Sequence, residues 1–292
     1  MIIKNIAIED NLFSIDDRLE IQNLISSLDS KNLTLETLWD LMDKVWDEMG
    51  CNNRCLDVDK LKIYYQHPVW LLNGLFIEKD PVSLQQRDSI AQWIAEHHLA
   101  YTVDYGGGFG TLARKIAQHS PNTRVEIYEP HPTELALSYC QSYSNIHFID
   151  RLQTNYDCLV CTDVLEHVPD PLKVLYQMVA AVQVGGYLII ANHFYPSIQC
   201  HLPSTFHLRY TFDSFTKVMG LEKVGPCVGS HATIYQKLRE PSFNWVKLRL
   251  MEVISKARFR WYSSSLNSIW IQIKQKLSLL KRRLKSILML NE

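Results

Sequence analysis

The stretch that decides the fold is Val103-Asp104-Tyr105-Gly106-Gly107-Gly108-Phe109-Gly110. The apolar residues that lead into it, ending in an acid, are typical of a buried parallel strand. Residues 111–117 then carry the apolar stripe of a helix start. A strand that turns directly into a helix needs positive φ angles and close backbone approach, which glycine supplies without strain. The stretch therefore predicts a nucleotide-type cofactor at the edge of a parallel sheet, facing the free N–H groups of the helix N-terminus.

A second acid ends the next predicted strand. Residues 124–129 read RVEIYE, and Glu129 stands nineteen residues after Gly110. A carboxylate there can bind both ribose hydroxyls of an adenosyl group, at roughly 1.5–3 kcal/mol per charged hydrogen bond. Residues 108–113 also satisfy the G-x-G-x-x-A form of the dinucleotide fingerprint. These features indicate an adenosine-type cofactor, either NAD or S-adenosylmethionine (SAM). The charge of Asp104 would repel a dinucleotide pyrophosphate and attract the ammonium group of SAM, but these residues together do not choose between the two cofactors.

The segment Asp163–Pro171, DVLEHVPDP, separates the two cofactors. It follows a predicted strand over 156–162, and an earlier strand over 145–149 has Asp150 at its tip. With this segment the chain resembles the class I SAM-dependent methyltransferases, in particular the group that includes the ubiquinone- and menaquinone-biosynthesis enzymes. The resemblance covers about residues 85–240. Residues 222–228 and 231–238 also read as two strands about a Gly229-Ser230 turn, the antiparallel ending that a methyltransferase sheet needs.

The resemblance implies an α/β fold with a Rossmann-like, seven-stranded methyltransferase sheet. It also implies that SAM is held by residues at the strand ends, namely Asp104, Gly106, Gly108, Gly110, Glu129, Asp150 and Asp163. The glycines would line the methionine part of SAM, with Asp104 near its amino group. Glu129 would hold the ribose and Asp150 would lie near the adenine amino group, or be a solvated loop acid. Asp163 would face the sulfonium.

Histidines gather in the segments that should follow the fourth and fifth strands. Methyl transfer is an in-line displacement, so positioning supplies much of the catalysis, up to ~7–11 kcal/mol in favourable cases. A general base adds about 10²–10⁴-fold where the acceptor loses a proton. We predict His193 or His207 as this base and give His167 a positional role, each also having an ordinary structural interpretation. Arg209 would hold an anionic or carbohydrate part of the acceptor, or form a surface salt bridge. No metal site is predicted.

The chain is expected to have three parts: an N-terminal helical cap (1–82), a SAM-binding methyltransferase domain (83–240) and a basic amphipathic helical tail (241–292). The cap is predicted from helical spacing of apolar residues, and Ser83-x-x-Gln86 predicts a capping box for a helix over 84–97. Aromatic and histidine side chains of the cap either face the substrate or form ordinary core: Tyr64, Tyr65, His67 and Trp70.

The tail is a distinct electrostatic unit. The net charge of −1 divides into −8 over residues 1–100, −3 over 101–236 and +10 over 237–292. Apolar residues over 266–287 form an a/d seam surrounded by lysines and arginines. Three interpretations stay open: binding to an anionic membrane surface through residues 266–288, a contact with a helix partner, and nucleic-acid binding, although no RNA motif is present. Membrane binding would suit a lipid-linked glycan or a quinone-like acceptor.

Composition indicates a soluble, cytoplasmic protein, peripheral on the inner face of the membrane if the tail binds lipid. No apolar run reaches the roughly eighteen residues of a membrane span. The N-terminus is not a secretory signal. The seven cysteines have no framework spacing, and Cys158 and Cys161 would lie on opposite faces of one strand, so reduced thiols are expected.

The predicted function is SAM-dependent methyl transfer to oxygen, nitrogen or carbon of a small molecule or of a carbohydrate or lipid conjugate. One alternative is an interaction protein that keeps the SAM fold without turnover. The other is a nicotinamide-dependent oxidoreductase or epimerase.

Overall fold

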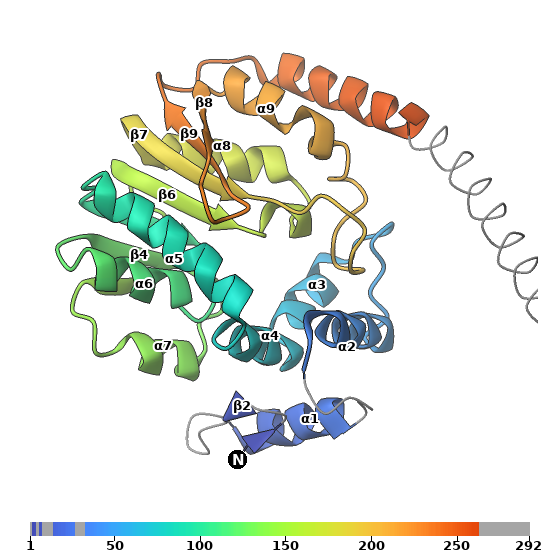
Figure 1. Ribbon diagram of the computed structural model, residues 1–292. Helices are drawn as coiled ribbons and strands as arrows, with labels where there is room; N and C mark the ends of the chain where they lie inside the picture. Colours follow the sequence, from blue (N-terminus) through green and yellow to red (C-terminus); the bar gives the residue numbers. More distant parts are fainter. Residues whose placement is uncertain (1, 4–5, 8–13, 27–32, 263–292) are drawn as a thin grey trace, which may run out of the picture. The chain divides into compact units, whose positions relative to one another are not determined.

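A mixed seven-stranded sheet forms the centre of the first of two units, Met1–Phe243 and Asn244–Glu292 (Figure 1). The computed structural model describes residues 2–3, 6–7, 14–26 and 33–262. The strand order is β5-β4-β3-β6-β7-β9-β8. The strands are β3 (Tyr101–Tyr105), β4 (Arg124–Tyr128), β5 (Ile146–Ile149), β6 (Tyr156–Thr162), β7 (Val182–Ala191), β8 (Leu221–Pro226) and β9 (Thr233–Lys237). This confirms the predicted Rossmann-like sheet.

The order of the strands reverses at the carboxyl ends of β3 and β6. β3 to β7 run parallel, and β9 pairs antiparallel with both β7 and β8. From β3 the chain moves outward through β4 and β5, then returns to place β6 on the other side of β3. In open α/β sheets ligands bind at such a reversal, outside the carboxyl ends of the strands. The glycine stretch and Asp163 both lie there.

Helices cover both faces of the sheet (Figure 1). Apolar residues of α5 (Pro81–Glu96) and α6 (Thr111–His119) share one buried cluster with Cys158 and Val160 of β6. Figure 1 shows α8 (Pro171–Ala181) behind the sheet, and α7 (Glu134–Cys140) and α9 (Leu208–Val218) complete this set. Because β6 is buried on both faces, it carries the nearly continuous apolar run that the sequence shows.

The capping box predicted at Ser83 is wrong, because α5 begins earlier. Asp80 is the N-cap, its side chain accepts the N–H of Ser83 at 2.7 Å, and Pro81 is the first helical residue. An aspartate followed by proline is a strong helix start, since proline lacks the N–H that this position leaves unpaired. The Ser83 hydroxyl is therefore inside the first turn.

Four further helices precede α5 and share a core of their own. They are α1 (Ile15–Ser26), α2 (Leu35–Glu48), α3 (Val58–Tyr65) and α4 (Val69–Ile77), after a two-stranded pair of β1 (Ile2–Ile3) and β2 (Ile6–Ala7). Their cluster includes Phe109 of the glycine stretch and, from the segment after β7, Ile198 and Cys200. The helices are thus packed on segments that leave two different strands of the sheet.

The second unit is described as far as residue 262. Residues 245–262 are helical, and the side chain of Asn244 accepts the backbone N–H of Val246 at 2.8 Å. Glu252 bridges Arg249 and Lys256 at 2.8 and 2.6 Å. The predicted a/d seam over 266–287 lies outside the described residues. Within the described ranges, no helix combines the length and apolar character needed to cross a membrane.

All cysteines of the chain are free thiols. Cys158 and Cys161 lie in one strand, β6, as predicted, and both are buried.

Candidate functional site

The glycine stretch forms a tight turn between β3 and α6. Gly106, Gly108 and Gly110 have φ angles of 76°, 52° and 72°, the left-handed region that side chains rarely adopt. Gly107 is needed for space instead, because a Cβ there would lie 2.7 Å from a carboxylate oxygen of Asp104. The Gly106 N–H donates to the Tyr128 carbonyl at 2.7 Å, which ties the turn to β4.

Asp104 provides a buried negative group beneath this turn. Its side chain is 2% exposed, and among the described residues its Oδ2 has no hydrogen-bond partner. Burial raises the pKa of Asp104 to about 7, with Arg87 lowering it and Glu129 adding to the rise. A buried carboxylate with an unused oxygen beside a glycine turn fits the ammonium group of SAM.

Glu129 is held rigidly at the end of β4. One carboxylate oxygen accepts the Gly108 N–H at 3.1 Å and the other accepts the His131 N–H at 3.2 Å. Burial raises the pKa of Glu129, and these two hydrogen bonds oppose the rise. The carboxylate that was predicted to hold the ribose is therefore joined directly to the glycine turn. Asp150, by contrast, is exposed beyond the end of β5.

Asp163 leaves β6 in a left-handed conformation, with φ of 55°. Its carboxylate lies 3.2 Å from Nε2 of His231, which belongs to the connection between β8 and β9. The hydrogen bond to Asp163 raises the pKa of His231, and burial opposes it. Asp163 thus lies at the carboxyl end of β6, and its carboxylate already has a partner.

Arg87 is a residue of this site that the sequence reasoning missed. It lies on α5, donates to the Ser83 carbonyl at 3.2 Å, and is close enough to Asp104 and Asp163 to interact with both charges. Burial lowers the pKa of Arg87, and the two carboxylates oppose that shift. No local pattern marks it, because only the packing of α5 on the sheet brings it to the strand ends. We call this set the cofactor side: Asp104, the glycine turn, Glu129, Asp163 and Arg87.

The helix α4 and the residue after it contact the glycine turn and the start of α6. Glu78, at the end of α4, accepts hydrogen bonds from the Thr111 hydroxyl and the Arg114 guanidinium in the first turn of α6. Gly74 of α4 leaves room for the ring of Phe109, since a Cβ there would lie 2.6 Å from that ring. The turn is therefore supported from outside the sheet.

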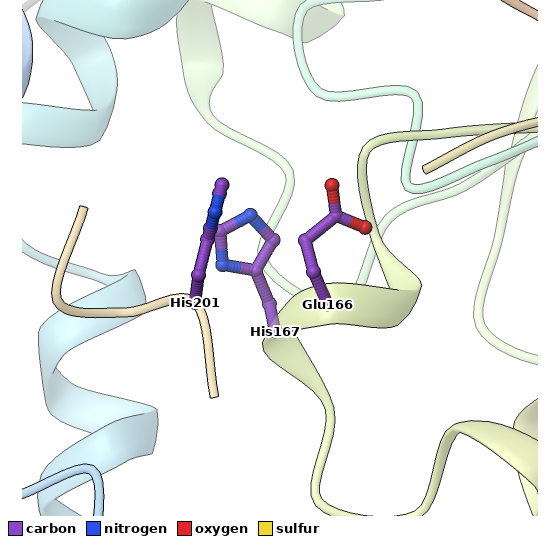
Figure 2. A group of neighbouring side chains, drawn as sticks. All are labelled: Glu166, His167 and His201. Atoms are coloured by element: carbon purple, nitrogen blue, oxygen red, sulfur yellow. The ribbon is translucent and has the colours of Figure 1, made fainter. Parts of the chain in front are cut away.

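A second group of side chains gathers beyond the end of β6. Glu166 and His167 form the short 3-10 helix η1 (Leu165–His167), and His201 comes from the segment between β7 and α9. One nitrogen or oxygen atom from each of the three lies within 4.8 Å of the others (Figure 2). We call the following six residues the acceptor side: Glu166, His167, His201, His193, Tyr65 and Trp70.

Burial sets the protonation of this group. It raises the pKa of Glu166 to about 8, with the charge of Asp163 adding to the rise. It lowers the pKa of His167 to about 3, with His201 adding to that shift. Burial also lowers the pKa of His201, so the neutral form is favoured for both imidazoles.

His193 is the most accessible of these imidazoles. It is half-buried, its Nε2 shares a 2.7 Å hydrogen bond with the Ser197 hydroxyl, and its backbone N–H donates to Glu166 at 2.7 Å. Burial lowers its pKa. The ring centroid lies 5.6 Å from that of His201. The neutral form, which a general base requires, is therefore favoured.

The structure places the other predicted groups differently. His207 is 2% exposed at the start of α9, where its ring packs against Phe215. Arg209 donates twice to the Phe194 carbonyl, at 3.1 and 2.7 Å, and stacks 3.7 Å above the Tyr195 ring. The planar fork of Arg209 thus braces the backbone of the segment after β7.

Two of the four N-terminal aromatic and histidine candidates reach the acceptor side. The rings of Tyr65 and Trp70 each lie 6.0 Å from His167. Their hydroxyl and indole N–H are buried without a hydrogen-bond partner in the described part of the chain. Tyr64 instead donates to the Met42 carbonyl within the core, and His67 accepts the Val69 N–H at the start of α4.

The α2 helix and the residues after it hold the segment that carries His201. Asp43 accepts the Gln199 N–H at 2.7 Å, and the Asn53 side chain donates to the Gln199 carbonyl at 3.0 Å. The Gln199 side chain donates to Asp47 at 3.0 Å. The acceptor side is thus assembled from segments more than a hundred residues apart.

Comparison with known proteins agrees with this geometry. Residues 75–219 match a family model described as a methyltransferase domain. The ubiquinone biosynthesis O-methyltransferase of Vibrio parahaemolyticus is 32% identical over 100 residues, which are 31% of this chain and 42% of that protein. The enzyme of the same name from Erwinia tasmaniensis is 31% identical over 130 residues, or 40% and 52%. The chain spans about half the length of these curated relatives.

A solved structure shares the fold. A Nostoc punctiforme protein with a proposed O-methyltransferase activity superposes with a TM-score of 0.50 and 16% identity, over 68% of this chain and 71% of that one. With the family match, the strand order and the cofactor side, this chain belongs to the class I SAM-dependent methyltransferases. The nicotinamide-dependent alternative is therefore wrong, since the family and the antiparallel β9 both differ from that class.

Proposed function

We propose that this protein transfers the methyl group of SAM to a hydroxyl oxygen of a small, ring-containing molecule. The observation that carries the proposal is the position of His193, a half-buried imidazole two residues after Ala191, the last residue of β7, whose carbonyl accepts the Asp163 N–H at 2.9 Å. The names of the curated relatives, which are O-methyltransferases, support oxygen as the acceptor atom.

The cofactor side would bind SAM through complementary charges. Asp104 would accept from the ammonium group through its unused Oδ2, and Arg87 would pair with the carboxylate of the same amino-acid moiety. Glu129 would accept from the ribose hydroxyls while keeping its bonds to the Gly108 and His131 N–H groups. Asp163 would lie on the sulfonium side. SAM supplies the electrophilic methyl group, and the protein fixes its direction.

His193 would take the proton of the acceptor. As the acceptor oxygen forms its bond to the methyl carbon, the carbon–sulfur bond breaks and S-adenosylhomocysteine leaves. The proton of the hydroxyl goes to the neutral His193 imidazole. The Tyr65 hydroxyl and the Trp70 N–H would donate to oxygen atoms of the acceptor, which would satisfy two buried donors. Aromatic side chains beside these donors favour an acceptor with a flat face.

The first experiment is a parallel calorimetric titration of the full chain with SAM, S-adenosylhomocysteine and NAD. Binding of the first two without NAD, followed by methylation of phenols, catechols or sugar hydroxyls, is the expected result. If none of the three ligands binds, the proposal is contradicted and an interaction protein that keeps the fold without turnover is favoured. Methylation only of amines or carbon acids would contradict oxygen as the acceptor atom.

A lipid-linked acceptor is a second candidate, favoured by one feature of the second unit. In its described helix, Trp261 and Tyr262 are 67% and 53% exposed, and the whole block 237–292 carries a charge of +10. Aromatic and basic side chains together bind anionic membrane surfaces. Flotation of the full chain with anionic vesicles, but not with neutral ones, would support a lipid-linked glycan or a quinone-like acceptor. Equal recovery with both vesicle types would contradict it.

A further inference from the structure

We propose that Glu166, His167 and His201 bind a divalent transition-metal ion of the zinc type. The three side chains lie side by side, two from η1 and one from the segment after β7 (Figure 2). One ligand atom from each lies within 4.8 Å of the other two. Two imidazoles and one carboxylate are a ligand set of catalytic zinc sites, which keep a fourth position open. The sequence predicted no metal here, because His201 is far from the other two along the chain.

Both imidazoles are oriented as metal ligands are. Nδ1 of His167 donates to the Cys200 carbonyl at 3.2 Å, and Nδ1 of His201 donates to the Tyr195 carbonyl at 2.7 Å. These bonds place the proton on Nδ1, so Nε2 of each ring carries a free lone pair. Histidines that bind metals usually donate their other N–H to a carbonyl or carboxylate in this way.

The carboxylate has an oxygen to offer. Glu166 is fully buried, and its Oε1 accepts the His193 backbone N–H at 2.7 Å. Its Oε2 is buried without a hydrogen-bond partner among the described residues. A buried polar oxygen in this condition costs free energy that a bound cation would recover. This oxygen is the third ligand.

The three ligands are already close to their required separation. Two atoms bound to a tetrahedral zinc ion, each about 2.0–2.1 Å away, lie about 3.3 Å apart. An ion would therefore draw the atoms of this cluster together by at most about 1.5 Å from the 4.8 Å limit. The two segments are fastened to each other, because the Leu202 N–H donates to the Glu166 carbonyl at 2.9 Å.

The catalytic role of the ion rests on the proposed function. The open position would take the acceptor hydroxyl and lower its pKa, as metal ions do for bound oxygen ligands. The proton would still pass to His193, whose backbone N–H holds Glu166, and the methyl group would still come from SAM with loss of S-adenosylhomocysteine. Metal binding itself requires neither cofactor nor acceptor, so it is tested alone.

The test is titration of chelator-treated, full-length protein with Co²⁺, followed by displacement with Zn²⁺. We expect one Co²⁺ ion to bind per chain and to give the visible absorption of a low-symmetry site with nitrogen and oxygen ligands. Glu166→Gln, His167→Gln and His201→Gln should each weaken binding by at least about tenfold, the lower end of what loss of an outer-shell partner already costs. His147→Gln, which changes an exposed histidine on β5, is the matched control and should bind like the wild type.

Measurements on the wild type keep the proposal testable if a buried variant fails to fold. X-ray absorption of the zinc-loaded protein should show two imidazoles and no sulfur. A sulfur shell, a thiolate charge-transfer band with Co²⁺, or equal weakening by His147→Gln would overturn the site. Failure to bind Co²⁺ while S-adenosylhomocysteine still binds would overturn the metal proposal and leave the proposed function. Loss of S-adenosylhomocysteine binding with intact Co²⁺ binding would overturn the proposed function alone.

Discussion

The glycine turn with Asp104, on the cofactor side, and the acceptor side of this molecule are built in opposite ways. The residues around Asp104 lie within a few positions of one another, and a single strand, turn and helix position them. The acceptor side joins Tyr65 and Trp70 to His167, which contacts His201 from the segment after β7. The first is a local backbone structure, and the second exists only after the N-terminal helices and the sheet have come together.

Because of this difference, substitutions in the two regions should have different effects. The glycine turn is constrained by backbone angles and by the volume of Asp104, so small changes there should act directly on SAM binding. The acceptor side is constrained by buried polar groups, several of which have no partner within the described residues. Substitutions there should leave SAM binding intact and change the rate or the acceptor affinity.

The largest expected effect is that of His193→Gln. Removing the proposed base should lower kcat by about 10²–10⁴-fold with the affinity for SAM unchanged. Steady-state kinetics with saturating SAM and calorimetry with S-adenosylhomocysteine measure the two quantities. His147→Gln is the control. A variant with wild-type kcat would show that His193 is not the general base of the reaction.

The next effect is that of Asp104→Asn on the cofactor side. Loss of one charge-assisted hydrogen bond should weaken SAM binding by about 1.5–3 kcal/mol, roughly 10–150-fold. Methyl transfer at saturating SAM should change far less, since Asp104 is expected to contact the amino group and not the methyl group. Calorimetry measures the affinity. Unchanged affinity would show that the ammonium group is held elsewhere.

The pH dependence of binding should come from the same carboxylate. With a pKa of about 7 in the protein without ligand, Asp104 is increasingly protonated below neutral pH. SAM requires the charged form, so affinity should fall as pH decreases, by up to about tenfold per unit. Titrations from pH 7.5 to about 5.5 should show this decline for the wild type and for Glu129→Gln. Asp104→Asn should abolish it, and a persistent decline in that variant would assign the dependence to another group.

The smallest effect is expected for Tyr65→Phe on the acceptor side. Loss of one neutral hydrogen bond should raise the KM for the acceptor by about 0.5–1.5 kcal/mol, roughly 2–12-fold. SAM affinity and kcat should stay near the wild-type values. Tyr64→Phe, which removes a hydroxyl bonded inside the core, is the matched control and should lower stability without raising KM. The reverse pattern would place the acceptor away from Tyr65.

Much of the fold could be predicted because its rules are local. The glycine stretch, the acid that ends β4 and the antiparallel pair of β8 and β9 all follow from residue type and short spacing, and the structure has each of them. The predicted start of α5 differs from the observed one because two possible N-cap residues, Asp80 and Ser83, lie three residues apart. The structure uses Asp80. His201 was one of several histidines in a loop, and nothing in the sequence distinguished it from His207.

The sequence by itself determined the class of protein and the glycine turn that follows β3, because backbone angles and strand ends are set by neighbours along the chain. Only the tertiary structure decided that Arg87 lies near Asp104 and that Arg209 braces a carbonyl. It also decided that Glu166, His167 and His201 share one buried place. The physical reason is that burial and polar pairing depend on segments distant in sequence, whose contacts form only when the helices pack on the sheet.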